Sequence, residues 1–453
     1  MEQVRTENKM GTMKVSRLLF STSLPIIISM IVQAMYNIVD SIFVAGYDPV
    51  AGTGALTAAF PIQSLMIAVS VGLAVGTNAL LSRSLGEKNF EKADVIAGHG
   101  FFLNICGYLI FLVFGLFLSG PFVASQVDPS SLTYAYGVEY ISIISICSIG
   151  VFIQVITERL LQATGKSFYS MIIQAGGAIT NIILDPIFIF GFGPIPEMGV
   201  AGAAIATVIG QALAAVLGIY FNLKFNKEIT LKIKNLIPKW NTVKEILEIS
   251  IPAVFMQAIG SFMTYSMNKI LIGFSEDAMN VFGLYFKLQS FVFMPVFGLT
   301  NGMVPIVSYN FGAKYKDRVF ETLKLSFIAA LCYMTLGFAA FQLIPAELLG
   351  IFNATSSMLE AGVPALRTIS ISFILASIGI ICSAGCQALG KSVYSLIISI
   401  GRQLVVLIPC AFLLSLTGVL SNVWWAFPIA EGVSLVLAVL FLLRAVKRAF
   451  RDK

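Results

Sequence analysis

Apolar segments of about 20 residues or more follow one another along the whole chain, separated by short polar stretches. A helix of about 20 apolar residues spans the ~30 Å hydrocarbon core of a bilayer. Transmembrane β-strands would give short alternating segments instead, and no such pattern runs through the chain. The pattern therefore predicts an all-α polytopic membrane protein with twelve spans, at about 18–46, 55–82, 96–124, 133–163, 167–192, 199–223, 245–274, 280–309, 319–346, 358–389, 393–416 and 421–444.

The composition agrees with a protein whose solvent is the lipid bilayer. Of the 453 residues, 57% are hydrophobic and 11% are charged, against about 25% charged in a soluble domain. The six cysteines lie inside apolar runs, and with a single histidine they form no zinc-ligand pattern. We therefore expect no metal cofactor. The net charge of +6 does not by itself indicate nucleic-acid binding, and we interpret it through the distribution of basic residues along the chain.

Basic residues concentrate on one side of the predicted topology. Of the 29 Lys and Arg residues, 24 fall near the two chain ends, in the central linker or in alternate loops. The opposite loops, for example 46–54 and 191–197, carry none. Because loops rich in Lys and Arg stay on the cytoplasmic side, we predict that both termini are cytoplasmic and that the chain lies in the plasma (inner) membrane.

Two segments of the chain recur at almost the same offset. Residues 162–177, QATGKSFYSMIIQAGG, return as 387–402, QALGKSVYSLIISIGR, at an offset of 225, and residues 61–86 match 287–312 at 226. Shared composition alone would not repeat Gly-Lys-Ser and Gln. We therefore expect an internal duplication into two six-helix lobes, 1–224 and 243–453, joined by a cytoplasmic linker, 225–242. Because each repeat has six spans, an even number, the chain returns to the side from which it entered, and both repeats begin on the same side of the membrane. We therefore expect parallel repeats.

Two spans of the N-terminal lobe carry polar residues along one helical face. These positions, three or four residues apart, are Ser29, Gln33, Tyr36, Asn37 and Asp40, and then Ser170, Gln174, Gly177, Asn181 and Asp185. An ionisable group inside the hydrocarbon layer is costly and therefore points to function. Asp40 and Asp185 reach a similar depth in their spans, so we predict that they meet.

A site around Asp40 and Asp185 has two chemical interpretations. Two carboxylates in one poorly solvated site cannot both be ionised cheaply, which suits a proton carrier. Together with the Asn181 oxygen and the Thr207 hydroxyl they also form an oxygen-rich cage, which suits Na⁺ as well as H⁺. Pro186 frees a further backbone acceptor nearby. The alternative is a protonated, hydrogen-bonded pair that only holds helices together.

The C-terminal lobe lacks counterparts of Asp40 and Asp185. It carries Arg402 and Glu431 instead, which we expect to form a structural or functional pair across its last two spans. Substrate sites in repeat-built transporters lie between the repeats, and flexible Met and aromatic side chains suit dissimilar hydrophobic cations, although many of them only pack helices. The candidates for such a cleft are Gln33, Tyr36, Asn37, Gln174, Gln257, Met256, Lys269 and Gln289.

Four stretches resemble helices of the multidrug and toxic compound extrusion (MATE) family of antiporters. They are SLPIIISMIVQAMYNIVDSIFVAG, ERLLQATGKSFYSMIIQAGGAITNIILDPIFIFGFG, GVAGAAIATVIGQ and VWWAFPIAEGVS, and with twelve spans and two lobes the likeness covers essentially the whole chain. The resemblance implies alternating-access export of organic, often cationic drugs and dyes, driven by inward H⁺ or Na⁺.

The resemblance also implies roles for particular residues. Asp40, Asn181 and Asp185 match the acidic cluster that one branch of the family uses in its N-terminal lobe, and Thr207 lies on the matching sixth helix. Another branch carries a functional acidic residue on the seventh helix, where this chain has Gln257. That departure favours the DinF-like or MepA-like branch.

Two other function classes remain open at this point. A flippase for lipid-linked envelope precursors would use a cationic cleft, for which Lys269, Lys287, Arg367 and Arg402 are candidates. An intramembrane enzyme would need aspartate-rich loops for Mg²⁺ and pyrophosphate, which the predicted cytoplasmic loops lack. Because no GxxxxGK[ST] loop is present, ATP-driven pumping is not indicated. We expect a monomeric transporter rather than an enzyme.

Overall fold

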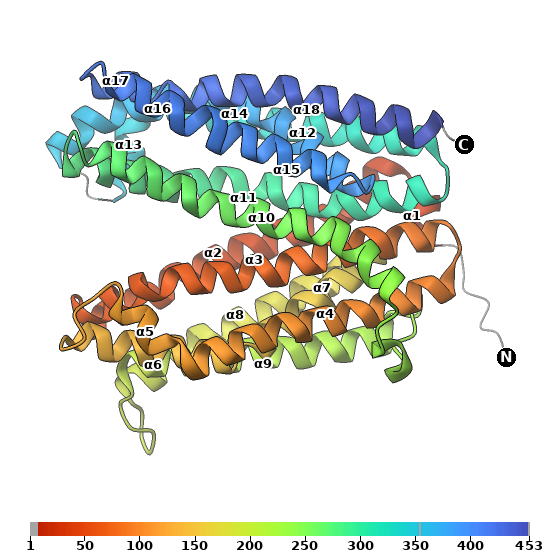
Figure 1. Cartoon of the computed structure of the whole chain (residues 1–453), viewed down its shortest axis with the longest axis horizontal. Coiled ribbons are helices and arrows are strands. Elements are labelled where there is room, and N and C mark those ends of the chain that lie inside the picture. The colour runs from red at the N-terminus through yellow and green to blue at the C-terminus, as the bar shows by residue number, and fades with distance from the viewer. Residues whose placement is uncertain (1–7, 353–354, 452–453) are drawn as a thin grey trace. The chain divides into compact units, whose positions relative to one another are not determined.

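The computed structural model describes residues 8–352 and 355–451. In these ranges the regular elements are helices, and extended pairing is confined to one bridge between Phe192 and Ile195. The elements, labelled in Figure 1, are α1 (Lys9–Thr12), α2 (Val15–Tyr47), α3 (Ala51–Gly86), α4 (Phe90–Phe117), α5 (Ser119–Ala124), α6 (Leu132–Ile146), α7 (Ile149–Ala163), α8 (Ser167–Phe190), α9 (Gly199–Phe225), η1 (Ile233–Leu236), α10 (Trp240–Leu271), α11 (Glu276–Gly312), α12 (Lys316–Leu343), α13 (Pro345–Gly350), α14 (Ser356–Ala388), α15 (Ser392–Ile400), η2 (Gly401–Leu407), α16 (Ile408–Ser415), α17 (Leu420–Val423) and α18 (Ala426–Arg451).

The prediction of an all-α protein with twelve membrane spans is confirmed. In the described ranges, 11 helices are long and apolar enough to cross a membrane, and the pair α6 and α7 makes a twelfth span with a 46° bend. The bend falls within the predicted span 133–163, at Cys147 and Ser148. The span Ser392–Ser415 is also irregular, because its middle part, η2, is π-helical.

Local sequence signals set several of the helix starts. Asn89 precedes α4 and accepts a hydrogen bond from the Lys92 backbone N–H, and Ser131 does the same for α6. Ser275 caps α11 in the same way. Each cap satisfies one of the backbone donors that a helix start leaves without an intrahelical partner.

The described residues form two compact units. The first contains Asn8, Lys9 and Ile28–Val254, and the second contains Met10–Ile27 and the described residues from Phe255 onward. These boundaries differ from those of the predicted domains 1–224 and 243–453. The reason is that the first part of α2 packs within the second unit, whereas the linker and the first part of α10 pack within the first unit.

Within the first unit, α10 crosses α3 at two glycines. A Cβ atom on Gly76 would lie 2.7 Å from the Ile246 carbonyl oxygen, and one on Gly72 would lie 2.8 Å from a backbone nitrogen of α10. Ser250 Oγ fits against this crossing and donates to the Leu73 carbonyl oxygen at 3.2 Å. Small residues at such crossings let membrane helices approach closely.

The second unit repeats this crossing between α2 and α11. A Cβ on Gly302 would lie 2.9 Å from the Ser23 Cα atom, and one on Gly298 would lie 2.6 Å from Ile27 Cγ1. Ser23 Oγ donates to the Leu299 carbonyl oxygen at 3.4 Å. The duplication predicted from the sequence is therefore visible as two copies of one serine–glycine helix crossing.

The linker lies against the start of α4 within the first unit. The Asp94 carboxylate accepts from the Thr230 backbone N–H at 2.7 Å, and His99 Nε2 accepts from the Lys239 backbone N–H at 2.6 Å. Lys166 Nζ donates to the Phe225 carbonyl oxygen at 2.6 Å. The linker is thus a docked segment that covers one face of α4.

Candidate functional site

Four buried oxygen-bearing side chains come together on α8 and α9. Asn181 Nδ2 donates to Asp185 Oδ1 at 3.1 Å and to Thr207 Oγ1 at 3.2 Å. Asp185 is fully buried, Asn181 is 3% exposed and Thr207 is 8% exposed. Asp40 on α2 is also buried, and its charge acts on Asp185. The structure therefore joins Asn181, Asp185 and Thr207 by hydrogen bonds and places Asp40 within electrostatic reach of Asp185.

Close packing of α8 on α9 positions these side chains. A Cβ on Gly210 would lie 2.7 Å from the Gly177 carbonyl oxygen, so glycine at this position lets the two backbones touch. Asn181 is one turn beyond Gly177, and Thr207 is one turn before Gly210 on its own helix. Pro186 inside α8 lacks a backbone N–H, which leaves one carbonyl of the preceding turn without its usual donor.

The cluster has more acceptors than donors. Asp40 Oδ1, Asn181 Oδ1 and Asp185 Oδ2 are buried, and no donor among the described residues reaches them. A buried polar atom without a partner costs about 1–3 kcal/mol, and more when it carries charge. Three such oxygens in one site are therefore suited to holding a proton or a hard cation.

Two residues that the sequence did not assign to this site lie beside it. The hydroxyl of Tyr140 on α6 accepts a hydrogen bond from Gln63 Nε2 of α3 at 3.0 Å. Both Tyr140 and Tyr36 interact electrostatically with the two carboxyl groups. Gln63 is a polar residue in an apolar span, which is a sequence signal for a functional position. Tyr140 gives no such signal, because its sequence pattern is that of an ordinary core aromatic.

The predicted substrate-cleft residues of the first unit fall partly together. Gln174 Nε2 of α8 donates to Gln33 Oε1 of α2 at 2.6 Å, so the polar faces of these two helices meet. Tyr36 is half-buried next to the acidic cluster. The side chain of Asn37 lies outside the described residues.

The predicted substrate-cleft residues of the second unit lie on α10 and α11. Met256 accepts a hydrogen bond from Gln387 Nε2 at 3.5 Å, whereas Gln257 is exposed. Lys269 is also exposed, with Nζ 5.8 Å from the Tyr265 ring centroid. Gln289 Oε1 is buried and receives no hydrogen bond from the described part of the chain. These contacts do not join the four candidates into one polar cluster.

Arg402 and Glu431 form an ion pair inside the second unit. Arg402 Nη1 donates to Glu431 Oε1 at 2.8 Å, and the two side chains are 26% and 14% exposed. Arg402 lies in the π-helical segment η2, and Tyr285 of α11 interacts with both charges. In the duplicated segments Arg402 occupies the place of Gly177, so an ion pair stands where the first unit has a close helix crossing.

Comparison with known proteins gives a consistent family assignment. The MatE family model matches residues 25–187 and again 252–413, which is well over half of the chain and follows the duplication. The multidrug export protein MepA of Staphylococcus aureus (strain bovine RF122 / ET3-1) is 27% identical over 424 residues, which are 93% of this chain and 92% of MepA. MepA of Staphylococcus haemolyticus (strain JCSC1435) is 27% identical over 434 residues, covering 95% and 94%.

Solved structures share the fold over the whole chain. The MATE multidrug transporter DinF-BH in complex with rhodamine 6G is 34% identical, with a TM-score of 0.89 over 99% of this chain and 100% of that structure. An outward-facing multidrug resistance MATE family transporter of the MOP superfamily has a TM-score of 0.92 at 22% identity, over 99% and 100% of the two chains. The second likeness concerns the fold alone.

Proposed function

The chain belongs to the multidrug and toxic compound extrusion (MATE) family, and on this premise we propose that it is a cation-coupled multidrug antiporter. It is a multi-pass membrane transporter and not an enzyme, and transporters of this family need no cofactor. We infer that it exports hydrophobic organic cations in exchange for H⁺ or Na⁺. The drug export by MepA and the rhodamine 6G bound to DinF-BH support substrates of this class.

The unpartnered acceptors of the acidic cluster carry the proposed ion coupling. Asp40 Oδ1 and Asp185 Oδ2 are buried without a donor among the described residues, and their charges repel each other. A proton on one carboxyl group removes this repulsion and supplies a donor. A bound Na⁺ offsets one of the two negative charges, lies between the carboxylates and takes the Asn181 and Thr207 oxygens as further ligands.

Ion binding is linked to substrate movement through α2. Asp40 lies on α2, and Gln33 and Tyr36 of the same helix face α8 and the acidic cluster. Compensation of the carboxylates lets α2 pack more closely on α8, which alters the polar surface at Gln33 and Gln174. We place drug release after this step, so that an ion entering from outside and a drug leaving use the site in turn.

The membrane potential can drive an exchange that moves net charge across the membrane. One elementary charge crossing ~150 mV releases about 3.5 kcal/mol, because 100 mV is equivalent to ~2.3 kcal/mol. At ~1.4 kcal/mol per tenfold change in concentration, this supports a gradient of about two to three orders of magnitude for a neutral exchange partner. A monovalent cationic drug exchanged for one ion moves no net charge, so the potential drives its export only when more than one ion enters per drug, and a one-for-one exchange is driven by the concentration gradient of the ion.

The distribution of charge supports an orientation in the membrane. Of the 29 basic residues, 24 lie near the chain ends, in the central linker or in alternate loops, so we propose that both termini and the linker face the cytoplasm of a plasma membrane. We propose a monomer as the working form, with the acidic cluster built from one chain.

The flippase alternative receives less support from the second unit. Its suggested cationic cleft depends on free basic side chains, but Arg402 is paired with Glu431. Lys269 and Lys287 lie over the rings of Tyr265 and Phe352, at 5.8 and 5.6 Å from the centroids. These contacts engage three of the four basic residues suggested for a pyrophosphate, and we do not propose this function.

A transport assay with the full chain in proteoliposomes tests the antiport. Rhodamine 6G movement is measured under an imposed proton gradient and then under an imposed Na⁺ gradient. We expect concentrative transport under one of them, lost in Asp40→Asn and retained in Glu360→Gln, which changes an exposed acidic residue. Equal transport by wild type and Asp40→Asn would remove Asp40 from the mechanism, and no transport under either gradient would contradict cation-coupled drug export.

A further inference from the structure

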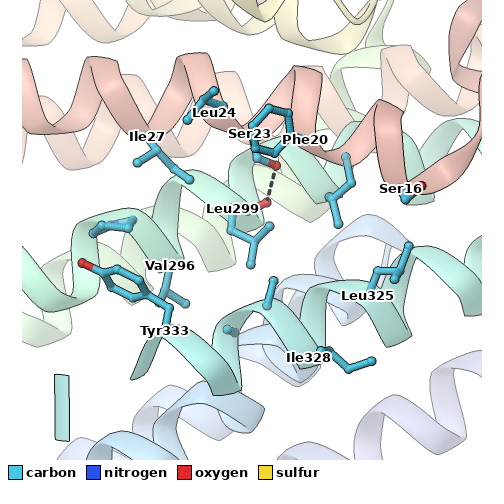
Figure 2. A pocket seen from close by; sticks show the side chains of 14 residues that line it. Ser16, Phe20, Ser23, Leu24, Ile27, Val296, Leu299, Leu325, Ile328 and Tyr333 are labelled. Atoms are coloured by element: carbon cyan, nitrogen blue, oxygen red, sulfur yellow. Dashed lines mark hydrogen bonds between the residues drawn. The ribbon is translucent and has the colours of Figure 1, made fainter. Parts of the chain in front are cut away.

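An apolar groove of about 430 Å³ lies within the second unit, between the first part of α2, α11 and α12 (Figure 2). Phe20 and Leu24 form the wall on α2, Val296 and Leu299 form the floor on α11, and Ile328 lies on α12. Phe20 is 66% exposed and Ile328 is 50% exposed, so the groove is open along its length. An open apolar surface of this kind marks a place of contact with another molecule or with lipid.

The duplication shows how the first unit treats the equivalent surface. Helices α4 and α12 begin and end 226 residues apart, so Leu325 in the groove has the place of His99. His99 is fully buried and accepts a hydrogen bond from the Lys239 backbone, because the linker lies over it. Leu325 is only partly buried and lines the open groove. The first unit thus covers with its own chain a surface that the second unit leaves open.

The length and depth of the groove fit one leaflet of the bilayer. Along α2 it extends from Ser16 to Ile27, which is about 16 Å at 1.5 Å per residue. This is about half of the ~30 Å hydrocarbon core. Both α2 and α12 enter the membrane from the side on which the N-terminus lies, which the proposed orientation makes the cytoplasmic side.

Exposed basic residues stand at the end of the groove nearest that side. Arg17 lies one turn before Phe20 on the same face of α2, and Lys14 lies one turn earlier. Lys324 lies one turn before Ile328 on α12. The first turns of α12 also carry Lys316, Arg318, Asp317 and Glu321, so together with Lys14, Arg17 and Lys324 this end has five basic residues and two acidic ones.

We propose that the groove binds an acyl chain of an anionic phospholipid of the cytoplasmic leaflet, with the headgroup held by Lys14, Arg17 and Lys324. The apolar walls accept the chain, and basic residues at a helix end beside the membrane attract anionic headgroups. The inference adds a lipid site to the proposed transporter and depends on the proposed orientation. It does not depend on which ion or drug is transported.

Photolabelling tests the site without any transport measurement. The full chain is placed in bilayers that contain phosphatidylglycerol or phosphatidylcholine with the same photoactivatable acyl tail, and labelled peptides are mapped by mass spectrometry. We expect label at Ser16–Ile27 and at Leu325–Tyr333, several-fold stronger with phosphatidylglycerol. Arg17→Gln with Lys324→Gln should remove this preference.

Two substitutions on α12 separate groove binding from general lipid contact. Ala329→Trp fills the groove and should lower the label several-fold, whereas Leu336→Trp, at a position 69% exposed on the same helix, should not. Equal labelling of the groove peptides by the two lipids would overturn the proposal. Label on the groove peptides that is no stronger than label on the exposed surface of α12 around Leu336 would also overturn it. Loss of label on addition of rhodamine 6G would assign the groove to drug instead. The comparison of phosphatidylglycerol with phosphatidylcholine on the wild-type chain tests the lipid site even if a variant fails to fold.

Discussion

The Asn181 side-chain amide of α8 donates to the Thr207 hydroxyl oxygen of α9 at 3.2 Å, and this bond joins two helices at the acidic cluster. The hydroxyl oxygen retains acceptor capacity that a metal cation can use, whereas a proton carried by Asp40 or Asp185 does not need it. Thr207 is therefore the residue that can separate Na⁺ coupling from H⁺ coupling.

Thr207→Val should distinguish the two coupling ions. It removes an oxygen and keeps the shape, so we expect Na⁺-driven export to fall at least tenfold while H⁺-driven export changes less than about twofold, a tenfold loss being ~1.4 kcal/mol of ion binding. Dye uptake under each gradient measures both, with Thr207→Ser as the control that keeps the oxygen. Equal losses under both gradients would mean that Thr207 acts only on packing.

Asp185→Asn should make the protein more stable while it stops transport. The substitution removes a buried charge that is repelled by Asp40, and we expect a gain of about 1–3 kcal/mol in the free energy of unfolding. Thermal unfolding in detergent without Na⁺ measures this, and a loss of stability at pH 8 would contradict an uncompensated charge.

Breaking the Arg402–Glu431 pair from one side should cost more than removing both charges. Removal of one partner from a fully buried pair costs about 3–5 kcal/mol. Since these side chains are 26% and 14% exposed, we expect about 2–3 kcal/mol for Arg402→Met. Adding Glu431→Leu should recover most of the loss. Thermal unfolding of the two single variants and the double variant gives the coupling energy, and additive losses would show that the charges do not interact.

The two serine–glycine crossings should be equally sensitive to a methyl group. Gly76→Ala and Gly302→Ala each place a Cβ within 3 Å of the crossing helix, so we expect losses of about 1–3 kcal/mol from overpacking. Gly283→Ala is the matched control, because a Cβ there meets nothing within 4 Å and alanine favours the helix by up to ~1 kcal/mol. Unfolding midpoints of the three variants decide whether the crossings are as tight as their geometry indicates.

Sequence patterns predicted the parts of the site that repeat with helical period. Asn181 and Asp185 are four residues apart in an apolar span, which predicts that they share one face of the helix. The free-energy cost of polar and ionisable side chains inside the hydrocarbon layer predicts that they have a function. The position of Tyr140 beside the site could not be predicted, because a buried tyrosine beside a polar site and one in an ordinary core have the same sequence pattern. Gln63 lies in the duplicated segment 61–86, and nothing in its spacing pointed to a contact with α6.

The exchange of helix segments between the units could not be predicted from hydropathy. A span that begins in one unit and continues into the other is as apolar as a span within one unit, and the boundary at Ile27 and Ile28 carries no local signal. Pro25 and Pro252 mark equivalent places near the two exchange points, but proline is common in membrane helices. Only the packing of Ser23 and Ser250 on the glycines of the opposite repeat reveals the exchange.

This exchange has a consequence for synthesis and for ancestry. The first unit lacks the segment that ends at Val254 until the ribosome has passed the linker, so it cannot be completed while only the first six spans have been made. A chain cut in the linker would leave each fragment without a piece of its own unit. Two copies of a single repeat could build the same two units only by exchanging these segments, as in a segment-swapped dimer.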